Sequence, residues 1–200
     1  MESRWRASGA LSRYAFWALL AVPAVPVLAS LAVGTADAES LLQPSGEFAA
    51  RFLIVALMIT PLRLLLPATR WLEWLARRRR AIGVAAFAYA ALHTGLYVVD
   101  MGTLRTMLAE LFALGIWTGW VAFGLMLVLG LTSNDASVRA LGRRWKTVHR
   151  CAYAAAVLTL VHWLVIHDSA TVALVHFAPL ALLAVYRLYQ LARSPLGLRR

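Results

Sequence analysis

The chain has 200 residues, of which 62% are hydrophobic and only 14% charged, and its formal net charge is +11. Soluble domains carry about a quarter of their residues as charged side chains, so this composition favours an integral membrane protein. Cys151 is the single cysteine, which excludes an intramolecular disulfide, and no Cys-x-x-Cys-His sequence is present for covalent attachment of a c-type heme.

Six apolar stretches are long enough to cross about 30 Å of hydrocarbon, which takes roughly 20 helical residues. They cover residues 14–33, 48–66, 81–99, 111–131, 148–166 and 171–191. Pro23, Pro26, Pro61 and Pro179 fall inside these stretches, and membrane helices tolerate proline, usually with a local kink. The sequence therefore predicts an all-α bundle of six transmembrane helices that occupies residues 1–200 as a single domain.

The first stretch also resembles a secretory signal. Arg4, Arg6 and Arg13 lie at its start, and the small-residue pattern Ala36-Asp37-Ala38 follows it. Its apolar run is longer than the about 7–15 residues of an ordinary signal core. We therefore expect an uncleaved first helix, whereas cleavage would leave five spans.

The basic residues divide sharply between the two sides of the predicted bundle. With the N-terminus placed in the cytoplasm, all of the 20 lysine and arginine residues except Arg51 and Arg105 fall on the cytoplasmic side. The opposite side receives acidic residues: Asp37, Glu39, Glu47, Asp100, Glu110 and Asp168. This bias predicts a multi-pass membrane protein with both termini cytoplasmic. It also removes the reason to expect nucleic acid, because basic residues on the cytoplasmic side of a membrane protein, next to membrane lipid, account for the net charge.

Two histidines are predicted to lie at similar depth in the outer half of the membrane. His93 is 13 residues beyond Arg80, or about 20 Å along the third span. His162 is 16 residues beyond Lys146, or about 24 Å along the fifth span, which runs in the same direction. Two neutral imidazoles that face each other across a bundle are what a six-coordinate heme iron requires.

A third histidine, His149, is expected near the cytoplasmic boundary, 13 residues before His162 on the same helix. A second heme there would lack an opposing histidine, because Arg80 and Arg79 occupy the matching positions before His93. We expect one of these arginines to contact heme propionates rather than iron, since a protonated guanidinium is a poor donor to a metal. Thirteen residues leave a side chain about 140° off the starting face, so His149 and His162 share a face only if the helix bends or unwinds.

Every histidine also has a structural interpretation. His93 and His162 could be hydrogen-bonded residues of the bundle, although ionisable groups inside membranes are usually functional. His149 could bind lipid headgroups. His167 is expected to be a structural residue of the outer turn, and His176 stays open between a structural and a functional role.

Several side chains near the span ends are expected to lie at the membrane surface. Trp71, Trp74, Trp117 and Trp145 are positioned where indole rings prefer the headgroup level. Arg63, near the inner end of the second span, is expected to extend to the cytoplasmic interface. Its alternative is a charge-assisted hydrogen bond to a heme propionate or a flavin phosphate.

Three segments together resemble a known family. They are Arg-Arg-Ala-Ile-Gly-Val-Ala-Ala-Phe-Ala-Tyr-Ala-Ala-Leu-His at 79–93, Leu-Gly-Arg-Arg-Trp-Lys-Thr-Val-His at 141–149 with His162-Trp163 after it, and Ile-Thr-Pro-Leu at 59–62. They are similar to the ferric-reductase-like transmembrane superfamily. Within it they resemble the MsrQ (YedZ) family, the heme-binding membrane subunits of bacterial periplasmic methionine sulfoxide reductase systems. The resemblance runs from about Ser45 to Tyr189.

The resemblance implies a heme b protein, with one or two hemes held by His93, His149 and His162, and with FMN as a further cofactor. It implies an electron-transfer subunit without substrate chemistry of its own. Electrons would come from a cytoplasmic flavin reductase or the quinone pool and would reach a periplasmic molybdopterin-dependent methionine sulfoxide reductase that repairs oxidised proteins. Larger relatives carry a second histidine on the third span, which is missing here.

Two other functions remain open at this point. The first is a stand-alone ferric reductase or an oxidase-like cytochrome b, which would need an open axial position at its outer heme. Ligation by both His93 and His162 argues against it. The second is a transporter or assembly factor whose histidines conduct protons.

Overall fold

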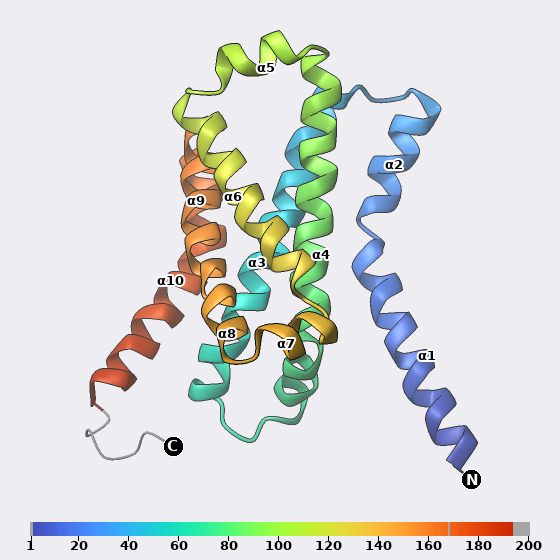
Figure 1. The fold of residues 1–200 in the computed structure, drawn as a ribbon, viewed down its shortest axis with the longest axis vertical. Helices are drawn as coiled ribbons and strands as arrows, with labels where there is room; N and C mark the ends of the chain where they lie inside the picture. The colour runs from blue at the N-terminus through green and yellow to red at the C-terminus, as the bar shows by residue number, and fades with distance from the viewer. Residues whose placement is uncertain (1, 168, 194–200) are drawn as a thin grey trace.

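The computed structural model describes residues 2–167 and 169–193, which form α-helices and no β-strand. The prediction of an all-α protein is confirmed (Figure 1). Three residues that entered the charge argument, Asp168, Arg199 and Arg200, lie outside the described part of the chain.

Within these residues, five spans are long and apolar enough to cross a membrane, and a sixth forms if two helices joined at a bend count as one. The helices of the five spans are α3 (Ala38–Leu65), α4 (Arg70–Met101), α6 (Leu114–Leu131), α8 (Arg143–His149) with α9 (Cys151–Ile166), and α10 (Ala170–Arg193). Large apolar side chains such as Leu182 and Val185 stay exposed on the outside of the bundle, as expected for a surface that faces lipid. The chain is a multi-pass membrane protein.

The bent span is the one predicted over residues 14–33. It consists of α1 (Glu2–Ala21) and α2 (Ala24–Val33), which meet at an angle of 52°. Pro23 lies at the break, because proline lacks the amide hydrogen and its ring crowds the preceding turn. The buried hydroxyl of Tyr89 on α4 donates to the carbonyl of Leu20 at 3.0 Å, which ties this break to the bundle.

Two helices begin well before the apolar stretches that marked them. α3 begins at Ala38 rather than at 48, because the side chain of Asp37 accepts a hydrogen bond from the Ser40 backbone at 3.0 Å and caps the helix. α4 begins at Arg70 rather than at 81 and includes the arginine cluster in its first turns. Hydropathy marks the part of a helix inside hydrocarbon, whereas the helix itself continues into the polar region.

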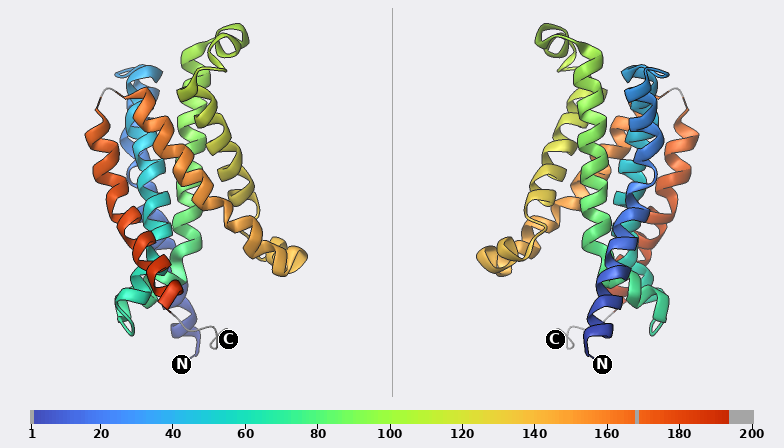
Figure 2. Two further views of the ribbon diagram at one scale, coloured as in Figure 1. Left: turned by 90° about the vertical axis from the view of Figure 1, so that its left-hand side faces the viewer. Right: turned by 90° about the vertical axis from the view of Figure 1, so that its right-hand side faces the viewer.

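The bundle is built from two closely packed pairs, α3 with α4 and α6 with α9. Glycine permits the close approach in the second pair, since a Cβ on Gly115 would lie 2.6 Å from Cδ1 of Ile166. Figure 2 shows that α6 and α9 lean away from α3 and α4 toward the end that carries α8 and α7 (Asp135–Leu141). The short α5 (Leu104–Glu110) covers the opposite end, so the two ends of the bundle differ in structure (Figure 1).

Candidate functional site

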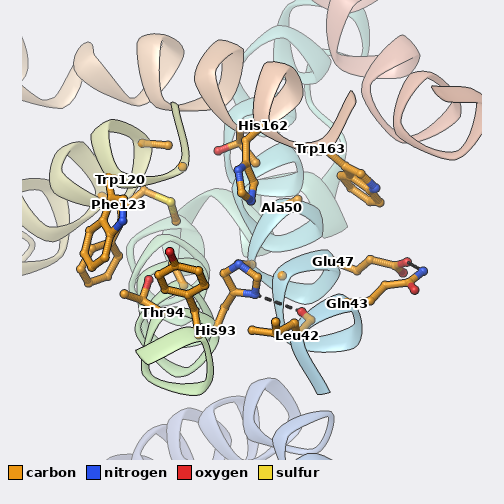
Figure 3. Close-up of a pocket in the computed structure, with 18 of the residues that line it drawn as sticks. Leu42, Gln43, Glu47, Ala50, His93, Thr94, Trp120, Phe123, His162 and Trp163 are labelled. Carbon is orange, nitrogen blue, oxygen red and sulfur yellow. Dashed lines mark hydrogen bonds between the residues drawn. The ribbon is translucent and has the colours of Figure 1, made fainter. Parts of the chain in front are cut away.

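Two of the predicted site residues face each other inside the bundle. His93 extends from α4 and His162 from α9, and their ring centroids are 6.0 Å apart with the planes at 79°. Figure 3 shows both rings directed into one cavity, with Trp120 and Phe123 on one side and Glu47 and Gln43 on the other. The two histidines that were expected at the same depth are thus neighbours in space.

The hydrogen bonds of these rings define which nitrogen is available. Nδ1 of His93 lies 3.0 Å from the carbonyl oxygen of Leu42, and Nδ1 of His162 lies 2.7 Å from that of Gly115. A carbonyl can only accept, so each Nδ1 carries the proton and each Nε2 keeps its lone pair. Neither Nε2 has a hydrogen-bond partner among the residues that the structure describes. A backbone carbonyl on one nitrogen and a free lone pair on the other is the usual state of a histidine that binds a metal.

The remaining wall of this outer cavity is largely aromatic and apolar. The cavity has a volume of about 110 Å³, and Trp120, Phe123 and Trp163 contribute to its lining. Tyr97 also lines it, and its buried hydroxyl has no hydrogen-bond partner within the described residues. Buried polar atoms are nearly always paired, so this hydroxyl indicates a partner supplied by something bound in the cavity.

A polar network adjoins the outer cavity between α3 and α10. Glu47 forms an ion pair with Arg51 and accepts a hydrogen bond from Gln43 at 3.1 Å. Nε of Arg51 donates to Nε2 of His176 at 3.1 Å, and Nδ1 of His176 lies 2.8 Å from the carbonyl of Val172. Both nitrogens of His176 are therefore engaged with protein, which favours the structural role among the two left open for it.

His167, expected to be structural, follows α9 directly. Its side chain lines the outer cavity, and its ring centroid is 6.3 Å from that of Trp163. It therefore lies closer to the paired histidines than its place in a turn indicated.

A second, larger cavity of about 510 Å³ opens where α6 and α9 lean away from α3 and α4. His149 lines it together with the basic residues Arg79, Arg80, Lys146, Arg150 and Arg187. The two arginines predicted to share a site with His149 are thus in the same cavity. Larger volume does not make it the stronger metal site, because only one histidine reaches it within the described residues.

His149 differs from the paired histidines in its contacts. Its Nε2 lies 3.1 Å from the hydroxyl of Thr132, and its ring stacks on Trp145 with centroids 3.9 Å apart. α8 ends at His149 and α9 begins after Arg150, so His149 and His162 open into different cavities rather than sharing one face. Trp145, expected at the membrane surface, packs on His149 and donates its indole N–H to the Thr132 carbonyl at 2.9 Å.

The arginines at the inner end of the bundle have protein partners. Nε of Arg79 donates to the carbonyl of Ala56 at 2.7 Å, and Arg80 forms an ion pair with Asp135. The hydrogen bond from Arg80, and after it the charge of the guanidinium, holds the pKa of Asp135 below its ordinary value of 3.8. Arg63, expected to extend to the cytoplasmic interface or to contact a cofactor, pairs with Glu73 at 2.8 Å, and both side chains are exposed.

A family model described as "Ferric reductase like transmembrane component" matches residues 45–160. Three relatives, from Brucella ovis, Brucella canis and Brucella suis, bear the name "Protein-methionine-sulfoxide reductase heme-binding subunit MsrQ". Each is 38% identical to the chain over 158 residues, which cover 78% of this chain and 69% of the relative. The chain belongs to the ferric-reductase-like transmembrane family and, within it, to the MsrQ family.

The part matched by the ferric-reductase-like model begins in α3 and ends in α9. It includes His93 and His149, and it stops two residues before His162. The bent first span and α10 lie outside it. The family match therefore covers most of the lining of both cavities, but not His162 of the outer cavity or Arg187 of the inner one.

Some residues of the outer cavity were not predicted from the sequence. Trp120 and Phe123 read as ordinary apolar residues of a span, and Gly46 and Gly119 carried no chemistry to single them out. In the structure these two glycines lie directly against the rings of His93 and His162. Their signal in the sequence would have been glycine inside a helix, where it is normally unfavourable.

Proposed function

We propose that the chain is a heme b electron-transfer subunit that passes electrons across a bacterial inner membrane to a periplasmic, molybdopterin-dependent methionine sulfoxide reductase. The observation that carries the proposal is the pair His93 and His162, each with Nδ1 on a carbonyl and Nε2 unengaged. The names of the MsrQ relatives support both the cofactor and the reductase system.

The donors of the outer cavity fit a heme better than a free metal ion. The described residues contain no group of three or more His, Cys, Asp or Glu side chains that could hold a metal. Two histidines alone suit an iron whose other positions are filled by a porphyrin. Metal–imidazole bonds of about 2.1 Å, as in zinc sites, place the centroids of two rings that face one metal roughly 6.5 Å apart, close to the 6.0 Å between His93 and His162.

The roles of the protein follow from this arrangement. A bound heme supplies one-electron chemistry at its iron. His93 and His162 would hold it from both sides, Tyr97 offers a hydrogen bond to a polar edge, and Trp120 and Phe123 exclude water. The identity of the two ligands, their burial and their hydrogen bonds set the redox potential. With His93 and His162 both bound to it, the heme would have no position left for a substrate, so the chain would pass electrons without substrate chemistry of its own.

The inner cavity is the proposed entry point for electrons. Its basic residues suit an anionic cofactor, either the propionates of a second heme beside His149 or the phosphate of FMN, through charge-assisted hydrogen bonds from Arg79 or Arg80. The donor would be a cytoplasmic flavin reductase or a quinone. Electrons then travel from the basic end of the bundle, placed in the cytoplasm, to the end covered by α5.

The decisive experiment is the spectrum of the purified protein. We expect a low-spin heme b, one heme lost in both His93→Ala and His162→Ala, and little change in His176→Ala, whose ring contacts only protein. A pyridine hemochrome titration of His149→Ala then separates one heme from two. Unchanged spectra in both outer variants would refute the ligand assignment. Fast binding of carbon monoxide to the reduced wild type would favour the stand-alone oxidase or ferric reductase instead.

A further inference from the structure

The ring of His93 rests on a small group of residues in α3. Its Nδ1 is 3.0 Å from the carbonyl of Leu42, and the hydroxyl of Ser45 lies between that carbonyl, at 2.9 Å, and the carbonyl of Leu41, at 2.8 Å. One residue further on is Gly46, where a Cβ would lie 3.0 Å from Nδ1 of His93 and 3.1 Å from Cε1. The imidazole edge thus lies directly on the backbone of the neighbouring helix.

The ring of His162 meets the same arrangement in α6. Its Nδ1 is 2.7 Å from the carbonyl of Gly115, and the hydroxyl of Thr118 lies between that carbonyl, at 2.9 Å, and the carbonyl of Leu114, at 2.6 Å. A Cβ on Gly119 would lie 2.7 Å from Nδ1 of His162 and 2.9 Å from Cε1. The same three positions recur: a carbonyl at i, a hydroxyl at i+3 and a glycine at i+4.

The spacing has a physical reason. In an α-helix the carbonyl of residue i already accepts from the amide of residue i+4, but the oxygen has a second lone pair. The Cβ of residue i+4 stands beside that oxygen and blocks a donor from another helix. Glycine at i+4 has no Cβ, so the imidazole can reach the carbonyl oxygen. The hydroxyl at i+3 can bond to the same carbonyl, because both belong to one helix. Ser45 and Thr118 are the two buried polar residues of the described chain, 0% and 2% exposed.

We propose that these two triplets, Leu42–Ser45–Gly46 and Gly115–Thr118–Gly119, are positioning units that fix the orientation and basicity of His93 and His162. The inference rests on the proposed role of both histidines as heme ligands. Each unit lies on the helix that is paired with its histidine's own helix, α3 for α4 and α6 for α9. Each pair of helices can therefore hold its ligand in place independently of the other pair.

Substitution of the glycine and substitution of the hydroxyl residue should shift the midpoint potential of the heme in opposite directions. A hydrogen bond from Nδ1 to a carbonyl makes the imidazole more basic, which favours ferric iron. Gly119→Ala pushes the ring off the Gly115 carbonyl, so we expect a more positive midpoint potential and weaker heme binding. Thr118→Val removes a hydroxyl that shares its one proton between the Leu114 and Gly115 carbonyls, which leaves the Gly115 oxygen more available to Nδ1, so we expect a slightly more negative potential with the heme retained.

The test compares purified holoproteins by potentiometry, by the low-spin electron paramagnetic resonance signal and by hemin titration of the apoproteins. Gly124→Ala is the control for Gly119→Ala on α6, and Gly95→Ala is the control for Gly46→Ala, because neither control Cβ would have a neighbour within 4 Å. Loss of such supporting contacts typically weakens metal binding about 10- to 100-fold. We expect a loss of this size for Gly119→Ala, a smaller one for Gly46→Ala and none for the controls.

The possible outcomes separate this inference from the proposed function. If His93→Ala and His162→Ala lose the heme but Gly119→Ala and Gly46→Ala match their controls in potential and signal, the positioning units are refuted and the ligands stand. If the histidine variants keep the heme, the proposed function fails instead. Should Gly119→Ala not accumulate, Gly46→Ala against Gly95→Ala decides, because the milder overlap at Gly46 leaves the helices packed.

Discussion

Arg51 is a charged residue inside a membrane-spanning helix, and its contacts explain how the bundle tolerates it. The guanidinium pairs with Glu47 one turn away on α3 and donates to His176 on α10. A charge in hydrocarbon is costly unless it is paired, and each partner here lacks an alternative in the lipid. The sequence alone placed Arg51 as an exception to the charge bias. The structure gives it a structural reason, since it joins α3 to α10 beside the outer cavity.

We expect Arg51→Met to destabilise the protein more than the same substitution in an exposed ion pair. Glu47 is only 15% exposed and would lose its cation, which costs about 3–5 kcal/mol for a fully buried pair. Since the Arg51 side chain is itself 38% exposed, the loss should be smaller, about 2 kcal/mol. The free energy of unfolding in mixed micelles measures it, and Glu47→Met combined with Arg51→Met should recover most of the loss.

Arg63→Met is the matched control. It breaks the pair with Glu73, whose side chains are 49% and 44% exposed, and exposed pairs contribute at most about 1 kcal/mol. Equal losses at Arg51 and Arg63 would contradict the interpretation of Arg51 as a residue held by burial.

At the level of elements, the bent first span is held to α4 by one buried hydrogen bond beside the apolar packing of Phe16 and Leu20. The hydroxyl of Tyr89 donates to Leu20 next to the break between α1 and α2. We expect Tyr89→Phe to lower the free energy of unfolding by about 1 kcal/mol, because the carbonyl loses a buried donor. Amide exchange should increase in α1 and α2 before it increases in α6 and α9.

Tyr97→Phe, the same change on the same helix, provides the comparison. Its hydroxyl has no protein partner among the described residues, so the apoprotein should lose no stability. If both substitutions cost the same in the apoprotein, the hydrogen bond to Leu20 is not what holds the first span.

The start of α3 is predicted to depend on pH through its cap. Hydrogen bonding by Ser40, by its side chain first and by its backbone N–H second, holds the pKa of Asp37 below its ordinary value of 3.8. The ionised carboxylate therefore stabilises the helix above the ordinary value, and this contribution is lost as the pH falls through the lower, folded-state pKa. The protection factors of residues 38–42, which correct for the intrinsic pH dependence of amide exchange, should fall in acid in the wild type and stay level in Asp37→Asn. A steady wild-type profile would show that the carboxylate contributes nothing to the cap.

For the whole molecule, the sequence predicted the features that depend on hydropathy and helix geometry, but not those that depend on how the helices pack. Hydropathy located the spans, and counting along them placed His93 and His162 at one depth, since the rise per residue of a helix is constant. It could not show that Asp37 starts α3 ten residues early, because that cap acts outside hydrocarbon. Nor could it show which helices pair. The places of Gly46 and Gly119 depend on that pairing, and so does the contact between Arg51 and His176.

The orientation of the bundle remains a prediction, and two matched alanines can test it. Ala109 on α5 and Ala136 on α7 are both exposed and lie at opposite ends of the bundle (Figure 1). In a Cys151→Ser background, a membrane-impermeant maleimide should label Ala109→Cys in intact spheroplasts and Ala136→Cys only after lysis, because the basic residues of α7 and α8 favour the cytoplasm. The reverse labelling pattern would place the basic cavity outside and reverse the proposed direction of electron transfer.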